Sequence, residues 1–146
     1  MQHEHRIMAV EYFNGTWNLI NKKSRTEDEK FEMIHKAHAS RYHWGFEGAD
    51  ENLARGEWLI SRVYSVLSLS ESALLHAERC LFYASEKQLS PYDFALACEA
   101  LARAYSIRNE RDKTSEYIGL ALSYADRIDY ADDREYVLSE LKNIAV

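Results

Sequence analysis

Apolar side chains recur at intervals of three and four residues along almost the whole chain, and this constrains the fold more than any other feature. Such spacing places them on one side of an α-helix, whereas the period-two alternation of a half-buried strand never persists. Residues that interrupt helices are rare, because 146 residues include only one proline and five glycines. The pattern therefore predicts an all-α protein.

Seven segments carry this spacing, and short polar turns separate them. They span about residues 5–21, 26 to an exit between Gly45 and Gly48, 50–68, 71–86, 91–108, 113–128 and 133–144. Helices joined by short turns pack as antiparallel hairpins. Residues 1–146 form one domain by length, and a chain of this size needs neither a disulfide nor a metal to bury a core.

Local signals mark several helix ends. Thr26 followed by Glu29 is a capping box, in which each side chain bonds the other residue's backbone N–H. Ser90 before Pro91 combines a cap with a proline that loses no needed hydrogen bond. Two further caps are predicted, at Ser70 and at Asp132–Glu135.

The stripes identify the expected buried faces. The first helix has Val10, Phe13, Trp17 and Ile20 in register, and the second has Phe31, Ile34, His38 and Tyr42. Gly56 lies on the apolar face of the third helix, so we expect the backbone of another helix to pass close to it.

Charge and cysteine content argue against several classes of protein. The formal net charge is −6, and the densest basic stretch, around Lys22 and Lys23, is followed at once by three acids. Nucleic acid and anionic membranes are therefore not expected partners. We find neither a signal peptide nor a membrane span, and Cys80 and Cys98 are expected to be small buried hydrophobes. The expected location is the cytoplasm.

Two stretches of the chain resemble each other. Aligning Tyr64 with Tyr105, 41 positions apart, pairs an aliphatic residue, a small residue and an arginine of one stretch with counterparts in the other. The pairs are Ile60 with Leu101, Ser61 with Ala102, Arg62 with Arg103, Ala77 with Ile118, and Cys80 with Ala121. The similarity indicates two related helical hairpins.

This pattern resembles the tetratricopeptide repeat, which places an aliphatic residue, a small residue and Tyr on its first helix and small residues on its second. The resemblance covers about residues 55–126, and 86–93 would accommodate an insertion relative to the usual ~34-residue repeat. Residues 1–48 and 129–146 would flank or cap the two hairpins. Both a right-handed stack of hairpins and a helical bundle of about seven helices remain open.

The resemblance also implies a binding groove. It places Arg55, Trp58 and Arg62 on the groove side of one helix, and Glu99 and Arg103 on the equivalent side of another. An exposed Trp flanked by arginines suits an acidic peptide segment or a peptide C-terminus. Two alternatives remain open. Trp58 belongs partly to the core while the arginines pair with acids such as Glu57 or Glu99, or the Trp58 face joins two copies as a homodimer.

The histidines suggest a different class of site. His35, His38 and His43 lie on or just beyond the second helix, and Glu32 precedes His35 by three residues. Helical di-metal sites require a second such pair, which this sequence lacks. One Zn or Fe could be held by His35 and His38 with His76 or a distant Glu. Alternatively, His38 is a hydrogen-bonded part of the stripe, and His35 and His43 are exposed.

The chain has no glycine-rich phosphate loop, no nucleophile elbow and no cysteine in an activating context. No cofactor is therefore expected. The leading interpretation is a non-enzymatic adaptor or scaffold that binds a protein or peptide. The alternative is a helical enzyme or sensor that holds a metal or small ligand with the histidines of the second helix.

Overall fold

The computed structural model describes residues 2–145, and within this range it contains seven helices and no strand. The helices are α1 (Gln2–Ile20), α2 (Glu27–Glu47), α3 (Asp50–Val66), α4 (Ser70–Glu86), α5 (Pro91–Ile107), α6 (Arg111–Ala125) and α7 (Ala131–Lys142). The predicted all-α class is confirmed, and each predicted segment coincides with one helix to within about three residues at either end.

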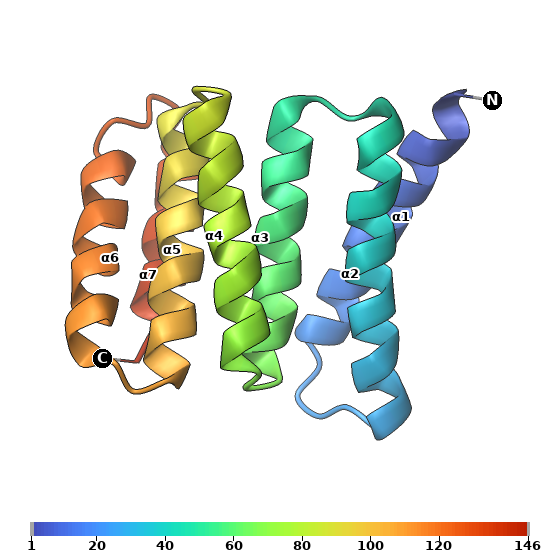
Figure 1. The fold of residues 1–146 in the computed structure, drawn as a ribbon, viewed down its shortest axis with the longest axis horizontal. Coiled ribbons are helices and arrows are strands. Elements are labelled where there is room, and N and C mark those ends of the chain that lie inside the picture. The colour runs from blue at the N-terminus through green and yellow to red at the C-terminus, as the bar shows by residue number, and fades with distance from the viewer. Residues whose placement is uncertain (1, 146) are drawn as a thin grey trace.

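The helices form a row of antiparallel hairpins (Figure 1). Each odd-numbered helix packs on both helices of the preceding pair: α3 on α1 and α2, α5 on α3 and α4, and α7 on α5 and α6. Among the described residues, the backbones of α1 and α2 do not approach α5, α6 or α7. The chain is therefore an open stack rather than a closed bundle.

Three successive turns have the same geometry. Each of α3, α4 and α5 is followed, after one cap residue, by a residue with positive φ, namely Ser68, Gln88 and Asn109 at 60°, 50° and 60°. The N–H of the next residue then returns to a carbonyl near the helix end, and in two turns that carbonyl belongs to Tyr64 or Tyr105. The two tyrosines aligned in sequence thus end their helices in the same way.

Two of the four predicted N-terminal caps are observed, and two are not. Thr26 and Glu29 form both hydrogen bonds of the capping box, and the Ser90 hydroxyl accepts from the Asp93 N–H. The other two predictions are wrong. Ser70 is already helical, and α7 begins after Tyr130 without a side-chain cap. The acids at the start of α7 lie in its first turn, where they face the positive end of the helix dipole.

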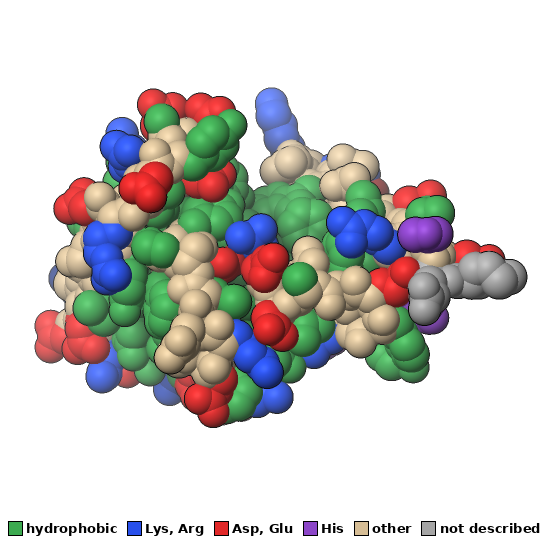
Figure 2. All heavy atoms as spheres, turned by 90° about the horizontal axis from the view of Figure 1, so that it is seen from above, with side chains coloured by type: hydrophobic (Ala, Val, Ile, Leu, Met, Phe, Trp, Pro, Cys, Tyr) green, Lys and Arg blue, Asp and Glu red, His purple; other side chains and the backbone are tan. Residues whose placement is uncertain are grey.

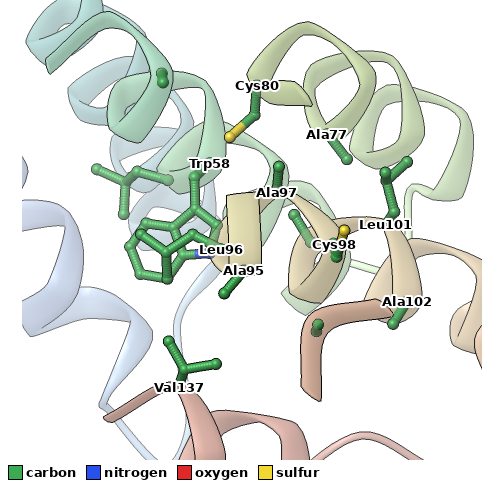
Figure 3. Close-up of a cluster of buried hydrophobic side chains, with 14 of the residues drawn as sticks. Trp58, Ala77, Cys80, Ala95, Leu96, Ala97, Cys98, Leu101, Ala102 and Val137 are labelled. Carbon is green, nitrogen blue, oxygen red and sulfur yellow. The ribbon is translucent and has the colours of Figure 1, made fainter. Parts of the chain in front are cut away.

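The core runs the length of the stack, and α3 and α5 are buried on most sides because neighbours cover them on both flanks. Figure 3 shows its central part, where Trp58 lies among buried side chains of α4, α5 and α7. Small residues such as Ala77 and Ala97 allow these helices to pack closely.

The stripe predicted for α2 is partly wrong. Phe31 and Tyr42 are 56% and 64% exposed. The reason is that α2 has neighbours on two sides, so its buried face is rotated away from this stripe, toward α1. The buried residues of α2 are Met33, Ala37, Ser40 and Trp44.

The close approach expected at Gly56 is confirmed. A Cβ at Gly56 would lie 2.9 Å from Arg41 Cδ and 3.4 Å from Arg41 Cα on α2. Gly119 on α6 has no atom within 4 Å of the equivalent position. Both glycines are helical, but only Gly56 lies against a neighbouring helix.

Substituting alanine at these two glycines is expected to have opposite effects. Gly56→Ala should lower the free energy of unfolding by about 1–3 kcal/mol, because α2 and α3 must separate slightly. Gly119→Ala should raise it by up to about 1 kcal/mol, because alanine favours helix. Urea unfolding of both variants measures the difference, and a shared sign would contradict the close packing of α2 on α3.

Candidate functional site

Glu99 on α5 is the centre of a buried polar network. Its side chain is fully buried, and its Oε1 accepts a hydrogen bond of 2.7 Å from Trp58 Nε1 on α3. Its Oε2 accepts from Arg62 Nη2 at 3.1 Å and from Arg103 Nε at 2.7 Å. One carboxylate therefore accepts hydrogen bonds from three side chains that the tetratricopeptide resemblance assigned to one groove.

Helix α7 completes this network. The Glu140 carboxylate accepts from Arg62 Nη2 and from the Tyr136 hydroxyl, each at 3.1 Å, and its backbone carbonyl accepts from Arg103 Nη2 at 3.0 Å. The donors come from three odd-numbered helices that lie in sequence along one side of the stack. The last helix is thus joined to α3 and α5 by charge as well as by apolar contacts.

Local spacing explains how these groups meet. Trp58 and Arg62 are four residues apart on α3, as Glu99 and Arg103 are on α5, so each pair lies on one side of its helix. The two helices pack against each other, which brings these sides together. The Arg62 guanidinium also lies 5.3 Å from the ring centre of Trp17 and 5.5 Å from that of Trp58.

The network keeps its charges ionised although it is buried. Burial alone would raise the pKa of Glu99, but the nearby guanidinium groups of Arg62 and Arg103 lower it below its ordinary value. Burial would likewise lower the pKa of Arg62, and the carboxylates of Glu99 and Glu140 raise it instead. The network thus contains two positive and two negative side chains that compensate one another.

The structure therefore revises the predicted groove. Trp58, Arg62, Glu99 and Arg103 do lie together, and Arg62 and Arg103 are on the same side of the molecule. The expectation that Trp58 is exposed is wrong, because only 4% of its surface is accessible. The alternative pairing with Glu99 is observed, whereas Glu57 pairs with Arg41 and His76 instead. Trp58 cannot act as an open contact surface for a peptide or for a second copy.

Arg55 is the predicted groove residue that keeps an accessible side chain, 38% of which is exposed. Its Nε and Nη2 donate to Asp93 at 2.8 and 3.3 Å, and its guanidinium lies 5.1 Å from the ring centre of Tyr92. These bonds use two of its five N–H groups. The Arg55 guanidinium is thus held in place by Asp93, and its other N–H groups remain available to a ligand.

Arg55 borders a recess between α1 and α3. Figure 1 shows α1 running obliquely behind α2 and away from α3 toward its N-terminal end. The recess left there has a volume of about 210 Å³. Its lining residues are Val10, Phe13, Trp44, Asn52, Arg55 and Gly56. Seen from above, the molecule is hollowed along one edge, and hydrophobic side chains line the hollow (Figure 2).

Sequence reasoning missed most of this recess. Val10 and Phe13 were assigned to a buried stripe, but Val10 is 42% exposed because α1 has only limited contact with α3. Asn52 accepts from the Ala49 N–H through Oδ1, which fixes its side chain at the start of α3. The available signal was the apolar stripe of the first helix, to which Val10 and Phe13 belong.

The three histidines proposed as metal ligands have separate surroundings. His35 is exposed, His38 Nε2 lies 2.8 Å from the Tyr64 hydroxyl, and His43 Nδ1 lies 2.8 Å from His5 Nδ1. Within residues 2–145, no three His, Cys, Asp or Glu side chains are grouped so that they could hold a metal ion. The geometry therefore gives the metal alternative no support.

His38 belongs instead to a network between α2, α3 and α4. His38 and His76 are in edge contact at 5.4 Å between ring centres, and His76 Nδ1 lies 2.7 Å from Glu57 Oε1. Arg41 Nε donates to the other oxygen of Glu57 at 3.1 Å. Burial, and then the neighbouring His76, lower the pKa of His38, although Glu57 opposes the shift.

We expect stability to fall as the pH drops below about 6.5, the ordinary pKa of histidine. Because the pKa of His38 is lowered in the folded state, the unfolded chain binds the proton more readily, and acid favours unfolding. Urea unfolding at pH 7.5, 6.5 and 5.5 should show a smaller loss for His38→Gln than for wild type. His3→Gln, on an exposed residue of α1, should behave as wild type, and equal losses in all three proteins would contradict the assignment.

Neither cysteine offers a reactive thiolate. Cys80 and Cys98 are both free and buried. Burial raises the pKa of Cys98 to about 11 and that of Cys80 well above its ordinary value. The expectation that both are buried small hydrophobes is confirmed.

The chain has no match among known protein families, curated proteins or solved structures. Within the described part of the chain, no helix combines the length and apolar character that crossing a membrane requires.

Proposed function

We propose that this protein is a non-enzymatic binding module, and that the recess between α1 and α3 receives an extended segment of a partner protein or peptide. The observation that carries the proposal is the recess itself. Apolar and aromatic side chains from α1 and α2 line it, and a partly exposed, pre-positioned arginine of α3 borders it.

The chemistry of the lining defines the expected ligand. Val10, Phe13 and Trp44 offer an apolar surface, while Arg55 and the Asn52 amide offer N–H donors at its edge. A segment with an apolar side chain next to an acidic one satisfies both, because guanidinium groups bind carboxylates well. Since Asp93 and Tyr92 already fix Arg55, ligand binding does not have to order it.

The order of helix contacts also supports a binding role. Each odd-numbered helix packs on the pair before it, which corresponds to the stack of hairpins, one of the two arrangements that the tetratricopeptide resemblance left open. In such a stack the odd-numbered helices share one face, and five of the six residues that line the recess belong to α1 and α3. The order of helix contacts bears only on the architecture, because one fold can serve many functions. The expected ligand follows from the residues that line the recess.

Selection of peptides from a random library on the whole protein tests the proposal. Selected sequences should combine an apolar residue with a nearby Asp or Glu. Val10→Asp should weaken binding of a selected peptide by at least about tenfold, or about 1.4 kcal/mol, because it places a carboxylate beside the ligand's own. Fluorescence anisotropy with a labelled peptide measures the affinity.

Leu75→Asp is the matched control, because Leu75 is an exposed aliphatic residue on α4, away from the recess. It should leave the affinity unchanged. Weakening by Leu75→Asp with no effect of Val10→Asp would place the peptide on the outer face and refute the proposed site. Both residues are exposed, so neither variant is expected to unfold the protein.

A further inference from the structure

One side of α1 is exposed along its N-terminal half. Among the described helices, α1 contacts only α2 and α3, and its N-terminal turns project beyond α2 at the end of the row (Figure 1). Four exposed residues follow one another along this side at spacings of four, three and four, and we call them the α1 seam: His3, Ile7, Val10 and Asn14. Ile7 is 57% exposed, so the seam presents apolar surface to solvent.

The spacing of these residues is that of a coiled-coil seam. Intervals of three and four residues define positions a and d of a heptad, which face a partner helix. Ile7 and Asn14 occupy a, and His3 and Val10 occupy d. In parallel coiled coils a β-branched residue at a favours two strands, and a single asparagine at a fixes the register and the number of strands. The seam therefore fits one parallel partner helix of the same kind.

The charges beside the seam are complementary to those of a second copy. Arg6 occupies position g, and Glu11 occupies position e of the next heptad. In a parallel pair, position g of one helix approaches the e position five residues further along its partner. A twofold axis thus joins Arg6 to the partner's Glu11 twice.

Within one chain these two charges do not meet. Residues five apart lie on different sides of a helix, and Glu11 forms no ion pair among the described residues. The Arg6 guanidinium lies 5.5 Å from the ring centre of Trp44, which holds it beside the seam. Both charges therefore remain available to a second copy.

We propose that α1 is a self-association surface, through which two copies form a parallel dimer with twofold symmetry. Ile7 and Val10 pack against their counterparts, and Asn14 forms a hydrogen bond with its own counterpart. The dimer does not depend on peptide binding in the recess, although Val10 borders both sites. Because the seam spans only residues 3–14, the buried area is small, and we expect a Kd between about 1 µM and 1 mM.

Sedimentation velocity of the whole protein, from about 0.01 to 1 mM, tests for the dimer. We expect the mass to rise from one chain to two. Ile7→Asp should weaken dimerisation at least about tenfold, because it places a carboxylate in the apolar seam of each copy. Met8→Asp is the matched control and should dimerise as wild type does, because Met8 is exposed on α1 but outside the seam. A monomer at every concentration, or equal weakening by both variants, overturns the proposal.

Exchange of the flanking charges tests the parallel arrangement at low ionic strength, where screening is least. Arg6→Glu and Glu11→Arg should each weaken self-association about threefold to tenfold, because each brings like charges together across the seam. An equimolar mixture of the two variants should form a mixed dimer as strongly as wild type, because every pair then joins opposite charges. No recovery in the mixture would overturn the proposed dimer.

Discussion

Replacing Glu99 with glutamine is expected to lower the free energy of unfolding by about 3–5 kcal/mol, the cost of leaving buried charges without their partner. The carboxylate is fully buried and binds Trp58, Arg62 and Arg103. Glutamine keeps the shape but removes the negative charge and turns one acceptor into a donor, which then faces a donor of the network. Urea unfolding at pH 7 measures the loss.

Glu110→Gln is the control for this prediction. Glu110 pairs with Arg108 at the surface, where both side chains are more than one-third exposed, so its replacement should change stability by at most about 1 kcal/mol. A loss of less than about 1 kcal/mol for Glu99→Gln would show that the network does not hold α3, α5 and α7 together.

Leu101→Ala is expected to lower the free energy of unfolding by about 2–5 kcal/mol. Leu101 is 2% exposed and lies within the central cluster, close to the middle of α5 (Figure 3). Truncation removes apolar burial and leaves a cavity, because α3, α4 and α6 around α5 are held by their own contacts. Guanidinium chloride unfolding of wild type and variant gives the difference.

Leu120→Ala provides the comparison on the neighbouring helix. Leu120 is 42% exposed on α6, so we expect a change of no more than about 0.5 kcal/mol. Equal losses at the two leucines would contradict the assignment of the core. The sequence alone does not separate them, since both leucines follow the helical spacing of apolar residues.

Helix positions could be predicted because their causes are local. The capping box at Thr26, the Ser90–Pro91 start of α5 and the spacing of apolar residues act within one or two turns. The repeat aligned on Tyr64 and Tyr105 likewise matches turns of shared geometry. The failures at Ser70 and Asp132 concern helix starts where the backbone enters the helix one or two residues earlier than the favoured side chain.

Burial was harder to predict, because it depends on which helices become neighbours. Trp58 was expected to be exposed, yet α7 covers it, and the bond from Arg62 to Glu140 joins residues 78 positions apart. Phe31 and Tyr42 fit the period of a buried face, but no helix of the described chain covers that side of α2. The spacing of apolar residues predicts that a helix has an apolar face, but it does not predict which helix, if any, covers that face.

The candidate site was predictable only in part. Four of the five groove residues do converge, because i, i+4 pairs on adjacent aligned helices must meet. Their convergence produces a closed network rather than an open surface, because Glu99 and Glu140 neutralise both arginines. The accessible recess instead depends on the tilt of α1 relative to α3, which no local pattern encodes.

The proposed peptide site is tested most directly by an isotope-filtered NOE spectrum of the protein bound to a selected peptide. We predict NOEs from the apolar side chain of the peptide to the Val10 methyl groups and the Phe13 ring, the accessible apolar residues of α1 in the recess. NOEs to Phe31, Phe46 or Phe82, which are exposed on α2 and α4, with none to Val10 or Phe13, would contradict it.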